Sequence, residues 1–200
     1  MILGSHNSWS YLPPTKWWMK PIAFMARCQS MSIREQYEAG VRCFDLRVRF
    51  SEYGLGIVAH GIVEYCYTAS RIYEDLAWLN EQGGCYVRVI HEVRTEKQYK
   101  NRWKYRFKHF CSTIEHDYKY IHFWCGRELY CWCYEYRFGG VEPSCDEKYS
   151  SVCPPRLLAW WPWLWAKIHN RDVLEQGTDM DILLIDFVKP HTGTDDGQED

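Results

Sequence analysis

Several features that mark other protein classes are missing from this sequence of 200 residues. No apolar run reaches the roughly 18 residues that a membrane-spanning helix needs, so no transmembrane segment is expected. Met1 leads directly into an apolar stretch without the basic segment that opens a signal peptide, so no signal peptide is expected. The formal net charge is only -2, which excludes a strong overall attraction to nucleic acid.

Two catalytic motifs and one cysteine pattern are absent as well. The sequence has no glycine-rich loop that would cradle phosphates and no Gly-x-Ser-x-Gly nucleophile elbow, which argues against the enzyme classes built on them. None of the 10 cysteines forms a Cys-x-x-Cys pair. Burial as small apolar side chains is the simplest explanation for them, and a structural metal or a disulfide is the alternative.

Aromatic residues, by contrast, are abundant, with 11 Trp and 15 Tyr. Many of them must be partly exposed, at a ligand site or at a lipid surface. Residues 9–31 are especially rich in them and are broken by Pro13 and Pro14. Two interpretations of this stretch stay open, namely a lid packed on the site or a rim that meets lipid.

Strand and helix patterns alternate along much of the chain, whereas residues 127–155 show no clear pattern. We expect strands at residues 1–3, 43–50, 57–60, 85–92, 120–124 and 182–188, and helices at residues 32–40, 70–81, 97–113 and 157–168. Such alternation predicts an α/β protein with parallel strands. Because a full eight-stranded barrel needs about 250 residues, we expect a trimmed or irregular TIM-type β/α barrel. Residues 1–190 would form this single domain, and residues 191–200 a disordered acidic tail.

Four polar residues suited to phosphoryl transfer each lie at or near the end of an apolar run. His6 lies in Gly4–Ser8, Asp45 and Arg47 lie in Cys43–Arg49, and His60 ends Val58–His60. One histidine can remove a proton while the other donates one, and the arginine can hold a charged phosphate. The remaining histidines, including His91 beside Glu92, are expected to be structural.

These stretches resemble the X domain of phosphatidylinositol-specific phospholipase C. The resemblance rests on Gly4–Ser8, Gln36–Arg49 and Ala59–Gly61, and Ile182–Val188 resembles the last barrel strand of that family. It is dense over residues 1–61, looser to Glu96 and thin from there to Asp181. The resemblance implies a barrel with its site at the carboxyl ends of the strands. It also implies cleavage of phosphatidylinositol-type lipids to diacylglycerol and a cyclic inositol phosphate.

The resemblance further implies a role for each site residue. His6 matches the general base that takes the proton of the inositol 2-hydroxyl, and His60 matches the general acid that protonates the glycerol oxygen. Arg47 resembles the arginine that stabilises the charged phosphorane in the metal-independent bacterial branch, so neither a metal nor another cofactor is expected. Asp45 would orient neighbouring groups, and Asp186 would hydrogen-bond His6 and fix its tautomer.

The sequence departs from the bacterial pattern at Asn7, where bacterial members usually carry Asp. Asn is the calcium-binding choice of the eukaryotic branch, and Glu92 matches one of the glutamate ligands there, but that branch needs a second acid where this chain has Arg47. We expect Asn7, Glu92, Arg127 and Tyr130 to contact the substrate.

The expected partners are a phospholipid substrate and, transiently, a membrane surface. Two alternatives stay open: a related barrel phosphodiesterase acting on another phospholipid or on a glycerophosphodiester, and a catalytically weak domain that binds a lipid headgroup. The histidine pair with Arg47 argues against the latter, since binding alone needs no paired acid and base. We expect a soluble protein, cytoplasmic or released, and the sequence specifies neither its compartment nor its oligomeric state.

Overall fold

The computed structural model of the chain describes residues 1–51, 56–93, 96–101, 113–121, 128–139, 149–151, 161–176 and 182–189. The strands are β1 (Ile2–Ser5), β2 (Cys43–Phe50), β3 (Gly56–His60), β4 (Val63–Glu64), β5 (Cys85–Val93), β6 (Thr113–Ile121), β7 (Glu128–Phe138), β8 (Tyr149–Ser151) and β9 (Ile182–Ile185). The helices are the 3-10 turns η1 (Trp17–Met19) and η2 (Ala23–Met25) and the α-helices α1 (Ile33–Glu38), α2 (Ala69–Gln82), α3 (Glu96–Lys100) and α4 (Pro162–Gln176).

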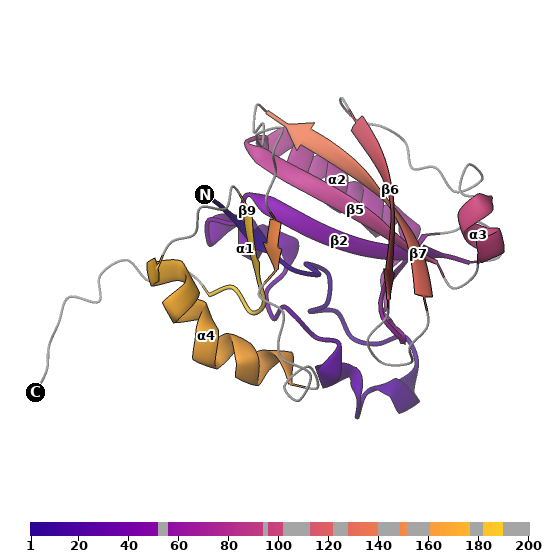
Figure 1. Cartoon of the computed structure of the whole chain (residues 1–200), viewed down its shortest axis with the longest axis horizontal. Coiled ribbons are helices and arrows are strands. Elements are labelled where there is room, and N and C mark those ends of the chain that lie inside the picture. Colours follow the sequence, from indigo (N-terminus) through magenta and orange to yellow (C-terminus); the bar gives the residue numbers. More distant parts are fainter. Residues whose placement is uncertain are drawn as a thin grey trace, which may run out of the picture.

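The strands form one mixed sheet whose main path runs β6-β7-β5-β2-β1-β9-β8 (Figure 1). Strands β5, β2, β1, β9 and β8 pair in parallel, whereas β6 and β7 form an antiparallel hairpin beside β5. The short strands β3 and β4 extend antiparallel from the end of β2. The α/β class predicted from the sequence is therefore confirmed.

The trimmed or irregular TIM-type barrel predicted from the sequence is not shown by the structure. Among the described residues, no pairing joins the β6 edge to the β8 edge, so the sheet stays open. The reason is β7, which pairs antiparallel along β5 from Cys85 opposite Phe138 to Val93 opposite Tyr130. This hairpin takes the place at which a barrel would add another parallel strand and helix.

Four expected elements also have different bounds. The strand expected at residues 182–188 is shorter, since β9 ends at Ile185. The helix expected at residues 97–113 is short, since α3 ends at Lys100 and Thr113 already begins β6. The strand expected at residues 120–124 is the end of β6, and the unassigned stretch from residue 127 contains β7. Helix α4 begins at Pro162, a position that suits a residue without a backbone N–H, and runs on to Gln176. The predicted tail at residues 191–200 lies outside the described residues.

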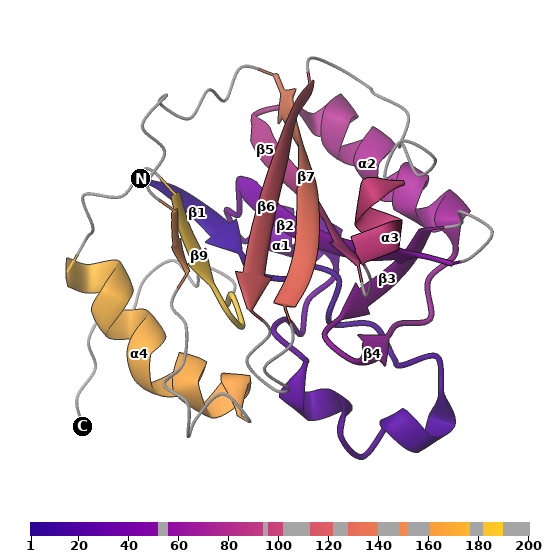
Figure 2. The same ribbon diagram turned by 45° about the vertical axis from the view of Figure 1, so that its right-hand side comes forward.

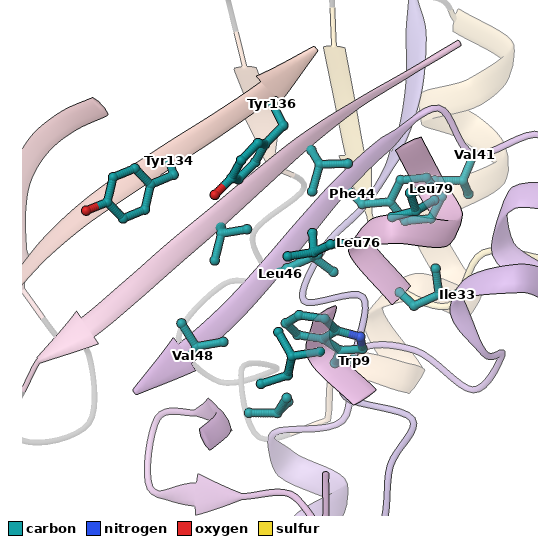
Figure 3. Close-up of a cluster of buried hydrophobic side chains, with 14 of the residues drawn as sticks. Trp9, Ile33, Val41, Phe44, Leu46, Val48, Leu76, Leu79, Tyr134 and Tyr136 are labelled. Carbon is teal, nitrogen blue, oxygen red and sulfur yellow. The ribbon is translucent and has the colours of Figure 1, made fainter. Parts of the chain in front are cut away.

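Alternation along β2 separates the core from the opposite face of the sheet. Phe44, Leu46 and Val48 point toward α2, where Leu76 and Leu79 pack against them (Figure 3). Because successive strand residues point to opposite faces, Asp45 and Arg47 lie on the face away from α2. The packing of this apolar layer thus fixes where Asp45 and Arg47 lie along β2 and the face to which they point.

Two helices tie the loops to the sheet. A capping box opens α1, in which the side chains of Ser32 and Glu35 accept from each other's backbone N–H groups. The buried side chain of Gln36 on α1 donates to the carbonyl oxygens of Ser8 and Met31 at 2.8 Å and 2.6 Å.

Helix α4 lies on the side of the sheet that carries β9 (Figure 2). None of the helices in the described ranges has both the length and the apolar character that crossing a bilayer requires.

Candidate active site

The candidate site lies where neighbouring parallel strands end. His6 follows β1, Asp186 follows β9, and Glu92 is near the end of β5, with β2 between them. The register places Ser5 beside both Ile185 and Phe44, so the next residues of β1 and β9 meet. Carboxyl ends of parallel strands are the usual location of ligand sites in α/β sheets.

Close approach of three strands at this point depends on Gly4 in β1. A Cβ atom there would lie 2.5 Å from the Leu184 side chain and 3.3 Å from the Leu183 carbonyl oxygen on β9. It would also lie 3.2 Å from the Cβ of Cys43 on β2. A side chain at this position would therefore require Leu184 to change its side-chain conformation and the strands on both sides of β1 to give by a few tenths of an ångström.

His6 is held at both ring nitrogens. Its Nδ1 lies 2.7 Å from Oδ1 of Asp186, and its Nε2 lies 3.0 Å from Nη2 of Arg47. In the neutral ring, Nδ1–H donates to the carboxylate and Nε2 accepts from the guanidinium, which assigns the tautomer from its partners. The His6 side chain is 18% exposed, so part of it is open to solvent.

Arg47 lies between two buried carboxylates. Its Nη2 donates to Oδ2 of Asp45 at 3.0 Å, and its Nη1 donates to Oε1 of Glu92 at 3.4 Å. Burial alone would raise the pKa of Asp45, but the positive charge of Arg47, together with the nearby His6 ring, holds that pKa at about 2. A second guanidinium, Arg49, lies 3.6 Å from Oε2 of Glu92, so the cluster pairs two cations with two anions.

His60 faces His6 from the end of β3. The two ring centroids are 5.7 Å apart and the rings are nearly perpendicular. The Nδ1 of His60 lies 3.0 Å from the carbonyl oxygen of Ala26, which assigns the proton to Nδ1 and directs Nε2 elsewhere. Burial, together with the nearby positive charge of Arg47, lowers the pKa of His60 to about 4.

The expected substrate-contact residues are placed less uniformly. Asn7 is fully buried with φ of 45°, and its amide oxygen and nitrogen have no hydrogen-bond partner among the described residues. Glu92 is also buried and accepts from the backbone N–H of Gly61 at 3.2 Å. Arg127 lies outside the described residues, and Tyr130 is described only by its place in β7. His91 stacks on Trp132 on the core face, which is consistent with a structural role.

Residues 26–29 are part of the site and were missed by the sequence analysis. The buried Gln29 side chain donates from Nε2 to the carbonyl oxygens of His6 and Ile185, at 3.1 Å and 2.9 Å, and its Oε1 accepts from the N–H of Val188. The carbonyl oxygen of Ala26 meets His60. One segment therefore contacts the surroundings of both histidines. No motif marks it, because most of its contacts go to backbone groups.

Metal-ligand types are also present in the site. Cys28 is buried, and its sulfur, a ring nitrogen of His6 and a carboxylate oxygen of Asp186 all lie within 4.8 Å of one another. On the other side of His6, the carboxylates of Asp45 and Glu92 face Arg47, whose charge occupies the position that a cation would take there.

Comparisons with known proteins add information on the fold. No family model and no curated protein matches the chain. Among solved structures, the phosphatidylinositol-specific phospholipase C of Listeria monocytogenes matches with a TM-score of 0.52 and 15% identity, over 94% of this chain and 88% of that one. At this identity the likeness shows the fold alone.

A second match is to the phosphatidylinositol-specific phospholipase C of Staphylococcus aureus. It is 28% identical over 40% of this chain, with a TM-score of 0.34. The chain spans only 26% of the length of that structure.

We expect acid to destabilise the fold in two pH windows. An unfolded histidine has a pKa of about 6.5, whereas that of His60 is about 4. The unfolded chain therefore binds more protons between these values, and stability falls as the pH drops from about 6.5 to 4. Asp45 adds a second loss between about 3.9 and the value of about 2 in the fold. Each group contributes a slope of at most about 1.4 kcal/mol per pH unit.

Urea unfolding at a series of pH values measures these slopes. His60→Gln should flatten the upper window without abolishing it, because burial also lowers the pKa of His91 well below its ordinary value. An unchanged slope in His60→Gln would show that His60 is not held neutral by the fold.

Proposed function

We propose that the chain is a phosphodiesterase that cleaves phosphatidylinositol-type lipids to diacylglycerol and a cyclic inositol phosphate. The observation that carries this proposal is the opposed pair His6 and His60, with Arg47 bonded to Nε2 of His6. A base, an acid and a fixed cation are the three groups that an in-line displacement at phosphorus needs.

His6 acts as the general base in the proposed first half of the step. Once Nη2 of Arg47 has turned from Nε2 of His6 to the phosphate, this nitrogen takes the proton of the inositol 2-hydroxyl, and the oxygen attacks phosphorus to form the ring of the cyclic phosphate. The His6 ring becomes positively charged, and Asp186, 2.7 Å from Nδ1, stabilises that charge and keeps the ring oriented.

His60 acts as the general acid in the second half. The oxygen of the glycerol departs with its bonding electrons as the phosphorus–oxygen bond breaks, and Nε2 of His60 gives it a proton. The low pKa of His60 in the free protein results from burial and from Arg47. A bound phosphate brings negative charge next to both residues, which raises the protonated fraction of His60 when substrate is present.

Arg47 stabilises the charge that develops on the non-bridging oxygens. To do so it exchanges part of its hydrogen bonding from Asp45 and Glu92 to the phosphate, while the two carboxylates keep it in place. Calcium is a poor substitute here, because it takes six to eight oxygen ligands and would be repelled by the guanidinium.

Exposed aromatic side chains next to the site support contact with a lipid surface. Trp17 is 79% exposed and Trp18 54% exposed on η1, and Phe24 on η2 is 47% exposed, whereas Met19 is buried. These turns precede residues 26–29, which hydrogen-bond the side chain of His60 and the backbone carbonyl of His6. Of the two interpretations of residues 9–31, this pattern favours the rim that meets lipid, because indole side chains partition to the membrane interface.

The central test is hydrolysis of headgroup-labelled phosphatidylinositol, run beside other labelled phospholipids and a glycerophosphodiester. We expect diacylglycerol and a cyclic inositol phosphate as products. His6→Ala and His60→Ala should each lower turnover about a hundredfold or more, because each removes one proton-transfer group. His169→Ala on α4 is the matched control. Near-native turnover of a natural lipid by His60→Ala would exclude His60 as the acid, and release of another headgroup alone would change the substrate assignment.

The second prediction concerns metal independence. We expect full activity in excess chelator and a loss of about 10²–10³ in turnover in Arg47→Ala, the cost of removing one fixed stabiliser of developing charge. Arg171→Ala on the exposed face of α4 is the control. Thermal melting of Arg47→Lys, which keeps the charge, separates loss of chemistry from loss of fold. Activity that disappears with chelator and returns with calcium would contradict the role of Arg47.

The third prediction concerns the membrane surface. Replacing Trp17 and Trp18 by Ala should weaken vesicle binding at least about tenfold, since burying one large apolar side chain contributes about 1.5–3 kcal/mol. Hydrolysis of a soluble headgroup analogue should stay nearly constant. The double variant of Trp161 and Trp163, which are 51% and 56% exposed beside or on α4, is the matched control. Equal losses on vesicles and on the soluble analogue would identify the loop as a packed lid.

A further inference from the structure

A soft metal-ligand cluster lies behind the general base proposed above. It comprises His6, Cys28 and Asp186, which come from the end of β1, the loop after η2 and the end of β9. The three ligand atoms lie within 4.8 Å of one another, and the His6 Nδ1 to Asp186 Oδ1 distance is 2.7 Å. Cys28 is 1% exposed and Asp186 5% exposed, whereas the His6 side chain opens to the site.

We propose that this cluster binds a thiophilic divalent cation, with Zn²⁺ as the best fit, and that the bound ion inhibits the reaction proposed above. A thiolate, an imidazole nitrogen and a carboxylate oxygen are the donor types that zinc takes in proteins. Calcium and magnesium prefer sites built from oxygen alone, and this cluster offers a sulfur and a nitrogen among its three donors. The set also leaves one tetrahedral position open for water or a substrate oxygen.

Only small movements are needed to close the cluster on an ion. Zinc bonds of about 2.0–2.3 Å place tetrahedral ligand atoms about 3.3–3.7 Å apart. The His6–Asp186 pair must therefore open by less than about 1 Å, and no ligand atom has to approach another by more than about 1.5 Å. Binding releases the thiol proton of Cys28 and moves the His6 proton from Nδ1 to Nε2, so the imidazole stays neutral. The thiolate and the Asp186 carboxylate then balance the double charge of the ion.

Backbone contacts hold the cluster in place without a metal. The hydroxyl oxygen of Ser10 accepts from the N–H of Cys28 at 2.8 Å, and the carbonyl oxygen of Cys28 accepts from the N–H of Phe187 at 2.6 Å. Asn170 on α4 donates to the carbonyl oxygen of Asp186. Phe187 has a positive φ of 50°, which turns the chain sharply after Asp186. The Cys28 backbone is therefore held beside the His6–Asp186 pair.

Inhibition rests on the proposed function and follows from the position of the ion. The ion would take the place of the Nδ1–H hydrogen bond from His6 to Asp186, which orients the base. It would approach His6 from the side opposite Arg47, whose guanidinium lies at Nε2. With its proton on Nε2, a metal-bound His6 cannot take the proton of the inositol 2-hydroxyl, and Nη2 of Arg47 has to turn away from that nitrogen.

Cobalt titration of the full chain tests the site independently of activity. Tetrahedral Co²⁺ bound to a thiolate gives visible ligand-field bands and a sulfur-to-metal charge-transfer band, and Zn²⁺ should abolish both by displacing it. We expect Cys28→Ser to remove the charge-transfer band and weaken binding about 10- to 100-fold or more, as even outer-sphere substitutions do at metal sites. Asp186→Asn should weaken binding while the band remains. Cys66→Ser, which changes an exposed thiol, is the control and should bind like the parent chain.

The same variants decide the outcome. The fold of Cys28→Ser is first verified by thermal melting. The proposed site would be overturned if this variant kept the thiolate band and full affinity. It would also be overturned if the parent chain showed no thiolate band. Zn²⁺ should inhibit phosphatidylinositol hydrolysis by the parent chain, and chelator should reverse this inhibition. The rate of each protein is expressed relative to its own rate in chelator. On this scale, the Zn²⁺ concentration that inhibits Cys28→Ser should be at least about tenfold higher than the concentration that inhibits the parent chain. Equal inhibition of both proteins would refute the inhibitory role. Absence of hydrolysis in chelator would refute the proposed function, and the cobalt titration would still decide the metal site.

Discussion

The pleat of β2 is the constraint on which both the core and the site depend. Phe44, Leu46 and Val48 pack toward α2, and this packing holds Asp45 and Arg47 on the opposite face. A shift of one residue in the register of β2 would exchange the two sets, burying a guanidinium in the core and leaving the site without its cation. The energy of the apolar layer therefore also positions the polar cluster, since neither set can move alone.

Charge pairing on that face carries a second constraint. Asp45 and Glu92 are buried, so each needs a cation close by, and Arg47 and Arg49 supply them. Removing one partner from such a cluster leaves an uncompensated buried charge, which costs far more than the net contribution of the intact pair. Arg47 thus stabilises the fold at the same position where it would stabilise a phosphate. A substrate anion that enters this cluster replaces a carboxylate contact with a phosphate contact and leaves Arg47 in place.

What could be predicted from sequence followed local chemistry. His6, Asp45, Arg47 and His60 each lie at or near the end of a short apolar run, and the structure brings the four side chains together. The direction of β7 is not local, because it depends on which strand edge is open when the chain returns, and the structure therefore shows an open sheet in place of the expected trimmed or irregular barrel. Gln29 and Cys28 were missed because they act through backbone carbonyls and through proximity created by β1 and β9.

The two histidines reach the site on structures of different kinds. His6 and Asp186 follow the parallel neighbours β1 and β9, while His60 ends β3, an antiparallel strand whose partners are β2 and the short β4. Because β3 does not pair with β1, sheet pairing alone does not fix the separation of the two histidines. The segment from Ala26 to Gln29 removes this freedom, since one end bonds His60 and the other bonds the carbonyl oxygens of His6 and Ile185. The spacing of the proposed acid and base is therefore set by a loop, and the same loop carries the exposed tryptophans of η1.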